Sequence, residues 1–548
     1  MKKLFTLVAF VLSAMSMNAE SYNGTLHIQV PTRFIDVNQV SNLEAYEEDG
    51  GTYELKLTDF NFQGLKVGTI DVKGVKADTN SIFTRLSYKG TTEIQPTSDG
   101  AGMLKGQTVQ LDLTGKFDKE TGIFAANIAI VAGEGEEALN ISVNFTNAQI
   151  PNSDFEDFHT FKPTANDAVK QTEPAYWHGF GSSMTKEGSF MDFSGMLKAY
   201  NQIEISEDVR DDEDAPTEKC VKLSSVNVAG ISISNGTLTT GRLQAGSVTA
   251  TSTANCAFLD LTNTDKDELG NPFYTTLTTI PDAVNLWVKF KRGGAASDYE
   301  IKKGFIGTGK YSTTASVKAV ITDGTYYQDP EAEEYSSVIG VAKDATIDTN
   351  NGEWQNLTIP FDYSKAKEDA KPKAILVNIT TNAYPGIGSK NANSPDELYV
   401  DDLSLVYNAG LKSVKFKGVE QEIVKVKDQT LVTINNAGEY SVEDFEVESD
   451  GAGAYVSYAV EHVYDPDFEE YGDELHINIV SADLQKENNY VVTINGGTLT
   501  GINHTKTNLP NGVNAIYNLA GQQVNSMTSG NVYIVKTTDG KTKKVIKK

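Results

Sequence analysis

Cysteine and histidine are scarce in this chain. Only two cysteines, Cys220 and Cys256, and six histidines occur among 548 residues, and the histidines show no metal-ligand spacing. This scarcity excludes a disulfide-rich scaffold and a zinc site built from paired cysteines and histidines. The two cysteines lie in one region and flank strand-like runs, so they could form one disulfide in an oxidising compartment. Two free thiols are the equal alternative, because the sequence does not give the distance between them.

Long hydrophobic runs are also missing beyond the first residues. A basic start, Met1-Lys2-Lys3, precedes an apolar run over residues 4–12, which is far shorter than the roughly 20 residues of a transmembrane helix. This pattern predicts a signal peptide over residues 1–19, cleaved after Ala19, with no cysteine at the cut that could carry a lipid. We therefore expect an exported protein, at the outer-membrane surface or extracellular, with no transmembrane segment after removal of the signal.

Positive charge is in short supply. The chain has 47 lysines and arginines against 74 aspartates and glutamates, a formal net charge of −27. Such a surface repels phosphate backbones, so nucleic acid is excluded as a partner. The excess of carboxylates suits divalent cations, although solubility outside the cell is the favoured explanation.

Alternation of apolar and polar residues is the main pattern that is present. Between residues 20 and 149, short segments place apolar side chains at every second position, and turns rich in Gly, Asp and Asn separate them. This pattern is typical of antiparallel strands with one buried face, and about eight of them could close a barrel. Because the chain is too long for one core, we expect three or four domains in an all-β protein.

Residues 20–149 resemble the calycin-like, lipocalin-related β-barrel domain of secreted proteins. The resemblance depends on the segments 22–26, 64–68 and 115–117 and on the closing strand over 138–145. It implies an eight-stranded barrel that either holds an apolar ligand or is filled by its own side chains. The filled barrel is the favoured interpretation.

Residues 150–408 form a second predicted unit, whose sequence differs in character from the segments before it. Its strand-like segments predict a jelly-roll β-sandwich. The opening Asn152-x-x-Phe155-Glu156 and the closing Tyr399-Val400-Asp401-Asp402-x-x-Leu405 are similar to jelly-roll carbohydrate metabolism domains and, more distantly, to carbohydrate-binding modules. The segment 236–243 resembles the same family. The resemblance implies that this unit recognises or handles a glycan outside the cell, and it brings no established catalytic residues.

Two smaller β units follow. Short strand-like runs predict a compact β-sandwich over residues 409–500. Residues 501–548 resemble the C-terminal sorting domain of type IX secretion substrates, through Tyr517-Asn518-x-x-Gly521-Gln522-x-Val524, a strand after Gly530 and a lysine-rich end. One departure from the usual pattern is the inserted Asn531. The resemblance implies that the secretion machinery is a partner and that the protein is displayed on the outer surface.

Carboxylates occur at both ends of the central unit. Asp154 and Glu156 lie at its start, and Asp401 and Asp402 lie at its finish. In a jelly roll the first and last strands are commonly neighbours, so these side chains could meet, and their oxygens suit a structural calcium ion. The favoured alternative is that they only cap strands and turns.

Aromatic side chains are candidates for stacking on the apolar face of a sugar ring. Trp177, with Tyr176 and His178 beside it, precedes a Gly/Ser-rich stretch and is predicted to lie in a ligand-binding loop. Trp287 and Trp354 lie within alternating segments, where core packing is the favoured interpretation. Three tyrosines lie beside turns and are further candidates for exposed aromatic residues: Tyr326, Tyr327 and Tyr384.

No catalytic site stands out in the sequence. Carboxylates are too abundant to select an acid and its partner, residues 211–214 form a charge run typical of a solvated loop, and no nucleophile elbow, phosphate loop or dinucleotide motif occurs. The sequence leaves catalytic activity open, but a protein without catalytic activity is the favoured interpretation. The preferred function is a glycan-binding accessory protein, followed by an adhesin or structural surface protein that binds protein partners, and last by a glycoside-active enzyme.

Overall fold

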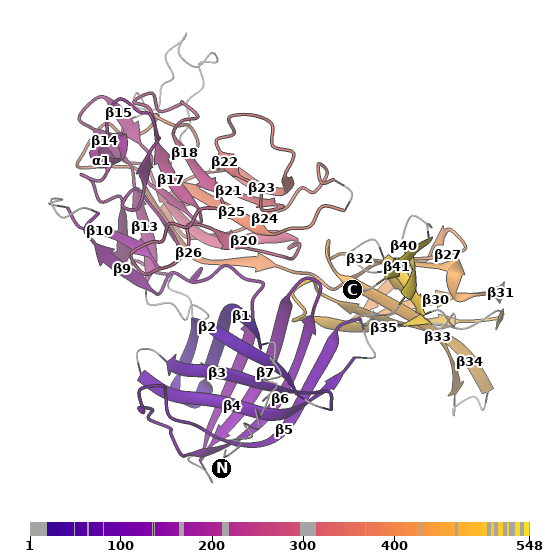
Figure 1. Cartoon of the computed structure of the whole chain (residues 1–548). Helices are drawn as coiled ribbons and strands as arrows, with labels where there is room; N and C mark the ends of the chain where they lie inside the picture. The colour runs from indigo at the N-terminus through magenta and orange to yellow at the C-terminus, as the bar shows by residue number, and fades with distance from the viewer. Residues whose placement is uncertain are drawn as a thin grey trace, which may run out of the picture.

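The computed structural model describes most of the chain (Figure 1). The described residues are 19–48, 50–62, 65–79, 82–133, 135, 138–163, 169–210, 219–295, 314–367, 369–427, 429–465 and 470–500, with the strand segments 506–508, 513–518, 523–524, 532–537 and 542–546. Residues 1–18 of the predicted signal peptide and the charge run at 211–214 lie outside them.

Strands dominate the described residues, so the all-β prediction is confirmed. An N-terminal barrel is followed by a series of further sheets. The one α-helix, among the residues described, is α1 (Phe193–Leu197). None of the helices found in these ranges has the length and apolar character needed to cross a membrane.

Eight antiparallel strands close the N-terminal barrel, with β1 pairing both β2 and β8. In β6, Val109, Leu111 and Leu113 are buried while Gln110 and Asp112 face solvent, as strand alternation requires. Inward side chains from all eight strands form one buried cluster, which agrees with the favoured interpretation of a barrel filled by its own side chains. The strands are β1 (Ala19–Val30), β2 (Ile35–Glu48), β3 (Thr52–Phe62), β4 (Leu65–Asp78), β5 (Thr84–Glu93), β6 (Thr108–Asp118), β7 (Ile123–Ala132) and β8 (Leu139–Thr146).

The central unit is a sandwich of two main sheets. The first has the order β12-β13-β26-β20-β24, and the second has the order β16-β25-β21-β23 with β19 pairing β25. Leu286 and Val288 of β20 and Val317 and Val377 of the second sheet share one buried cluster, so the two sheets pack face to face. A smaller sheet of order β11-β17-β18-β22 and the pairs β9–β10 and β14–β15 complete the unit.

The strands of the central unit are short at its start and longer toward its end. They are β9 (Phe158–Phe161), β10 (Gln171–Pro174), β11 (Met184–Thr185), β12 (Ile203–Ser206), β13 (Cys220–Ser224), β14 (Val226–Val228), β15 (Ser232–Ser234), β16 (Thr237–Thr239), β17 (Arg242–Ala245), β18 (Cys256–Leu259), β19 (Thr275–Thr276), β20 (Ala283–Lys291), β21 (Ala315–Thr322), β22 (Tyr327–Asp329), β23 (Val338–Ile347), β24 (Gln355–Pro360), β25 (Ala374–Thr380) and β26 (Glu397–Val406).

The C-terminal strands form a third unit and a tail. Three sheets, β28-β27-β32, β29-β30-β35-β34-β33-β37 and β31-β36, share a buried cluster, and β39-β38-β40-β41 form a separate sheet. The strands are β27 (Leu411–Phe416), β28 (Val419–Glu420), β29 (Ile423–Val426), β30 (Gln429–Ile434), β31 (Gly438–Tyr440), β32 (Phe445–Ser449), β33 (Tyr455–Asp465), β34 (Glu470–Val480), β35 (Glu487–Ile494), β36 (Gly497–Leu499), β37 (Lys506–Asn508), β38 (Val513–Asn518), β39 (Gln523–Val524), β40 (Val532–Thr537) and β41 (Thr542–Ile546).

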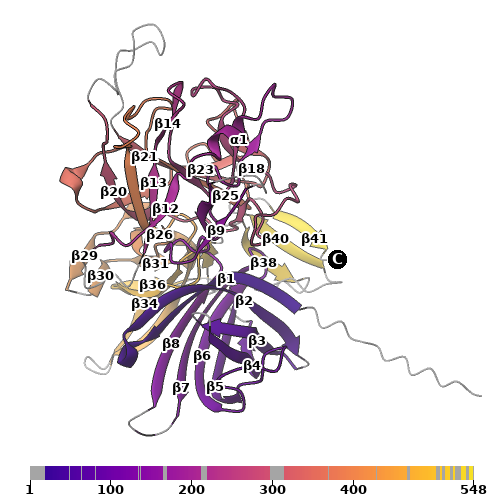
Figure 2. The same cartoon turned by 90° about the vertical axis from the view of Figure 1, so that its left-hand side faces the viewer.

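Buried contacts join the barrel, the sandwich and the third unit. One hydrophobic cluster contains Phe83 and Ile123 of the barrel, the sandwich core, and Tyr455 and Leu484 of the third unit. The Tyr455 hydroxyl donates a hydrogen bond to Asp118 at 2.7 Å, and its ring meets that of Phe83 edge-on at 5.5 Å. Figure 2 shows the barrel lying against the other two units. A continuous core of this kind opposes independent motion of the units.

The two cysteines do not form the disulfide that the sequence left open. Cys220 and Cys256 are both free and buried. Cys220 begins β13 in the first main sheet, whereas Cys256 begins β18 in the smaller sheet. Burial raises the pKa of Cys220 to about 12 and that of Cys256 to about 11, so both thiols stay protonated at neutral pH.

Candidate functional site

A cavity of about 330 Å³ lies on the outer face of the second main sheet. Val317, Ala319 and Ile321 of β21 point into the sandwich core, so the alternate residues Ser316 and Lys318 point outward and line the cavity. Its volume lies within the range of small-ligand sites. Neighbouring strands extend this polar floor with Thr237, Lys343, Asn378 and Thr380.

A hydrogen-bond network holds part of the floor in place. Lys318 Nζ donates to Asp329 Oδ1 at 2.7 Å and to the Tyr327 hydroxyl at 3.0 Å. Asn378 Nδ2 donates to the other carboxylate oxygen of Asp329 at 2.8 Å. Burial, helped by the charge of Asp329, raises the pKa of Tyr327 well above its usual value, so the hydroxyl remains neutral. The network pre-organises Lys318 and Asn378 on the sheet.

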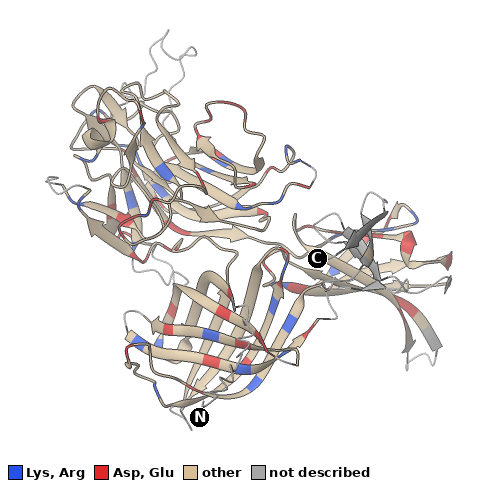
Figure 3. Ribbon diagram, in the orientation of Figure 1, with Lys and Arg blue, Asp and Glu red and all other residues tan. Residues whose placement is uncertain are grey.

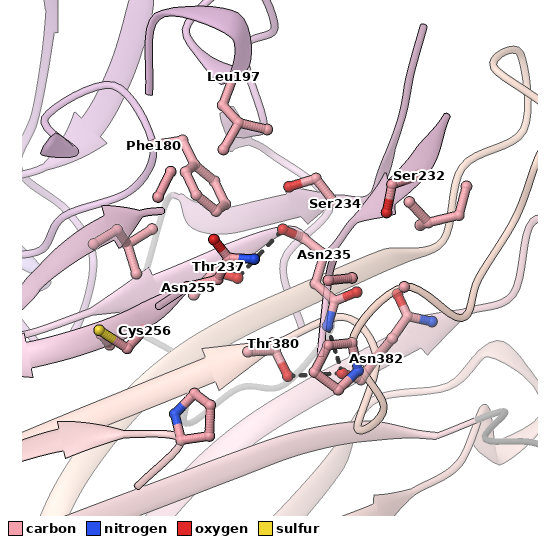
Figure 4. Close-up of a pocket in the computed structure, with 18 of the residues that line it drawn as sticks. Phe180, Leu197, Ser232, Ser234, Asn235, Thr237, Asn255, Cys256, Thr380 and Asn382 are labelled. Atoms are coloured by element: carbon pink, nitrogen blue, oxygen red, sulfur yellow. Dashed lines mark hydrogen bonds between the residues drawn. The ribbon is translucent and has the colours of Figure 1, made fainter. Parts of the chain in front are cut away.

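Within the described part of the chain, two amide oxygens beside the cavity have no hydrogen-bond partner. They are Asn235 Oδ1 and Asn378 Oδ1, and both atoms are buried. The amide nitrogen of Asn235 is already used, because it donates to the carbonyl oxygen of Asn382 at 2.8 Å (Figure 4). A buried acceptor without a donor destabilises a fold by about 1–3 kcal/mol. Donors of a ligand would reach these oxygens only after a shift of the groups that cover them, because neither atom is exposed to solvent in this structure.

Apolar side chains form another wall of the cavity. Phe180 and Leu197 lie together on one side in Figure 4, away from Thr380 and Asn382. At the rim, Ile231 is 68% exposed. The cavity therefore suits a ligand that is apolar on one face and rich in donors on the other.

Trp177 is not on the surface, so the prediction of a ligand-binding loop there is wrong. The side chain is fully buried, packs against Phe155, and donates from its indole nitrogen to the carbonyl oxygen of Pro151 at 3.1 Å. The Gly/Ser-rich stretch after Trp177 is a tight turn around the buried carboxylate of Glu173, which accepts from the backbone of Gly179 at 2.9 Å and of Ser182 at 3.0 Å. Small residues there reflect close packing rather than an exposed loop.

The other predicted aromatic residues divide between core and surface. His178 and Tyr327 are fully buried, so they cannot contact a ligand from solvent, and Tyr176 is half-buried. Tyr326 and Tyr384 are 38% and 41% exposed, in agreement with their expected positions beside turns. Of these two tyrosines, Tyr384 lies between two residues that line the cavity, Ala383 and Pro385.

Trp287 and Trp354, which were expected to pack in the core, are only partly buried. Leu286 and Val288 of β20 point into the sandwich and are fully buried. The side chain of Trp287 therefore faces outward, and both Trp287 and Trp354 are half-buried.

The four predicted carboxylates do not form a joint calcium site. The opening segment does lie beside β26, because the backbone N–H of Leu403 donates to the carbonyl oxygen of Ser153 at 2.8 Å. The cation at this point is Arg210, which pairs with Asp402 and lies 4.0 Å from Asp401. Glu156 instead accepts from the backbone of Lys219 at 3.1 Å. No cluster of three or more metal-ligating side chains occurs in the described ranges.

The polar floor of the cavity was not found from the sequence. Its signal is weak: Ser316 and Lys318 alternate with apolar residues, as on any half-exposed strand. Only the sheet order places β16 next to β25 and β25 next to β21, which brings Asn235 and Asn378 to one cavity. Figure 3 shows that basic and acidic residues are interspersed along the ribbon of the barrel and the sandwich, so charge does not mark the site either.

Comparison with protein families assigns the first unit. A closed eight-stranded antiparallel barrel belongs to the size class that lipocalin relatives share. Residues 19–148 match the family model of the calycin-like beta-barrel domain, which confirms the resemblance stated for this part of the chain. No curated protein matches the chain.

Proposed function

We propose that this is a secreted or surface-displayed glycan-binding accessory protein, and that the 330 Å³ cavity of the central sandwich is its binding site. The observation that carries the proposal is a pair of buried acceptors, Asn235 Oδ1 and Asn378 Oδ1, which have no partner among the described residues and lie beside a cavity with one apolar wall. This arrangement matches a pyranose, which has an apolar C–H face and a rim of hydroxyl donors.

Two sequence features support secretion or display on the cell surface. The leader over residues 1–19 is typical of export, and residues 501–548 resemble type IX sorting domains, which pass through the secretion machinery to the outer surface. The resemblance of residues 150–408 to carbohydrate domains points to the same class of ligand. In this proposal the filled barrel is a rigid support for the sandwich rather than a second ligand carrier.

The test uses the whole mature chain, because the sandwich shares its core with both neighbours. A glycan array should identify bound sugars, and titration calorimetry should measure their affinity. Asn378→Ala removes one open acceptor and should weaken binding about tenfold, since one hydrogen bond contributes about 1 kcal/mol or more. Asn489→Ala, at an asparagine of β35 in the third unit, is the matched control and should bind like the wild type.

A negative array would decide against the proposal. If no glycan binds, or if Asn378→Ala binds as tightly as Asn489→Ala, the cavity is not a glycan site. The adhesin interpretation then takes precedence.

A further inference from the structure

A second cavity, of about 290 Å³, lies between the barrel and the central sandwich. Thr25 and Asn38 line it from the outer wall of the barrel, and Asn285 and Trp287 line it from β20. The connecting segment contributes Asp154. The cavity exists because the barrel and the sandwich are held together, and small-molecule sites are common at such domain boundaries.

A β-bulge shapes the sandwich wall of this cavity. β26 pairs with β20 through Ser404↔Asn285 and Asp401↔Trp287, so β26 has one more residue than β20 between these pairs. Asp402, within the extra stretch, has a φ of 43°, a left-handed conformation that is uncommon outside glycine. Bulges redirect side chains and are frequent beside binding sites. Here Asp402 and Ser404 both line the cavity.

The Trp287 ring is fixed at the cavity wall. The guanidinium of Arg210 lies 4.6 Å from the ring centroid, and Arg210 is itself held by Asp402 with 7% of its side chain exposed. The ion pair neutralises Asp402, so that carboxylate needs no further cation. An immobilised indole costs little additional entropy when a sugar stacks on it, and stacking on an aromatic ring is a common mode of sugar recognition.

Asp154 is a buried acceptor at the same cavity. Its exposed fraction is 8%, and it accepts a hydrogen bond from the side chain of Asn38. Burial, with smaller contributions from the charges of Glu156 and Asp402, raises the pKa of Asp154 to about 7. Hydroxyl donors from a ligand would replace the hydration that burial removes from this carboxylate.

We propose that this interdomain cavity is a second carbohydrate site, which takes one uncharged sugar unit. The C–H face of the sugar packs on Trp287, and its hydroxyl groups bond to Asp154 and to the side-chain amide of Asn38, while Asn285 is held in the wall by its hydrogen bonds to Asn356 and Thr358. Among the described residues that line the cavity there is no Lys, Arg or His, so the site disfavours an anionic sugar. It uses the first main sheet, whereas the 330 Å³ cavity uses the second, and the proposal does not rest on that cavity being a glycan site.

The experiment measures binding of glucose, galactose, mannose, N-acetylglucosamine and their β-linked disaccharides to the full mature chain. Saturation-transfer NMR detects binding, and intrinsic tryptophan fluorescence gives the affinity. Asn38→Ala changes the site from the barrel side, where the sandwich fold is untouched. Asn42→Ala is its matched control, because Asn42 lies four residues further along β2 and outside the cavity. A Trp287→Ala protein that unfolds would lose binding for that reason alone. Trp287→Phe keeps an aromatic ring and therefore tests the role of the ring in a protein that still folds.

The expected result is binding that Asn38→Ala weakens about tenfold, equivalent to the loss of about one hydrogen bond between the sugar and the Asn38 amide. Trp287→Ala should abolish it, Trp287→Phe should retain part of it, and Asn42→Ala and Asn378→Ala should leave it unchanged. The inference is overturned if none of these sugars binds, or if Asn38→Ala and Trp287→Phe both bind like the wild type. Loss of all binding in Asn378→Ala alone would favour the proposed function and refute the second site. Loss of binding in Asn38→Ala and Trp287→Ala, with Asn378→Ala unchanged, would favour the second site and count against the proposed function.

Discussion

Arg85 and Glu487, 402 residues apart in the sequence, form a two-pronged ion pair between the barrel and the third unit. The guanidinium donates to the two carboxylate oxygens at 2.9 and 2.6 Å. Lys116 of the barrel lies 2.9 Å from the same carboxylate, and Asn478 donates to it at 2.7 Å. Arg85 first, then Lys116 and Asn478, lower the pKa of Glu487 to about 2. This carboxylate therefore adds a charged contact to the hydrophobic contact between the barrel and the third unit.

Glu487→Gln should loosen the contact between the barrel and the third unit. The amide cannot accept from Arg85 and Lys116 as the carboxylate does, and we expect the free energy of unfolding to fall by about 1 kcal/mol, a value kept small because the pair is partly exposed. Urea denaturation and limited proteolysis at the junction measure the effect. Asp112→Asn is the control, because it removes an exposed pairing with Lys89. Equal stability of the two variants would contradict a role for Glu487 in domain docking.

Acid should weaken the same contact in the wild type. The pKa of Glu487 is about 2 in the folded chain, below its ordinary value of 4.5, so the stability it contributes is present above that ordinary value. It is lost as the pH falls through the folded pKa. The wild type should therefore lose more stability than Glu487→Gln between about pH 4.5 and pH 2, in melting experiments over that range. Parallel profiles for the two proteins would rule out this linkage.

Asp154→Asn should have the opposite pH dependence. The pKa of Asp154 is about 7 in the folded chain, above its ordinary value of 3.8, so its contribution to stability is full at low pH and is lost as the pH rises through 7. The variant stays neutral, and its stability relative to the wild type should increase by about 2 kcal/mol between about pH 5 and pH 8. Urea denaturation at several pH values tests this, with Asp112→Asn as the surface control. A relative stability that does not change with pH would contradict the assigned environment.

Trp177→Ala should damage the fold rather than a binding surface. The indole is fully buried against Phe155, and removal of a buried tryptophan side chain costs about 3–5 kcal/mol. Trp354→Ala, at a half-buried position, should cost much less. Thermal unfolding compares the two variants. A Trp177→Ala protein that melts like the wild type would show that the residue is not in the core.

Thiol titration should find two free cysteines. We expect two equivalents of reactive thiol after denaturation of Cys220 and Cys256 without reductant, and very slow labelling of the native chain because burial keeps both thiols protonated. The melting temperature should be the same with and without dithiothreitol. A decrease on reduction would indicate a disulfide and contradict the placement of these residues in separate sheets.

Local pattern predicted more of the fold than of the site. The alternation in residues 108–113 reappears as β6 with Val109, Leu111 and Leu113 inside, and such alternation, together with the calycin-like resemblance, predicted the barrel. Alternation also explains why Trp287 is not in the core as expected, because its neighbours Leu286 and Val288 are the residues that point inward. Trp177 was misassigned because glycine and serine mark a mobile loop and a tightly packed turn equally well in a sequence.

The sequence by itself determined the all-β class and the barrel, because strand periodicity and turn residues are local properties that each segment expresses alone. The tertiary structure decided everything that depends on pairing between distant segments. Sheet order brought Asn235 and Asn378 to one cavity, and it placed Arg210 beside Asp402, one of the carboxylates for which the sequence left a calcium ion open. Such neighbours are selected by the packing energy of the whole sandwich, which no short stretch of residues encodes.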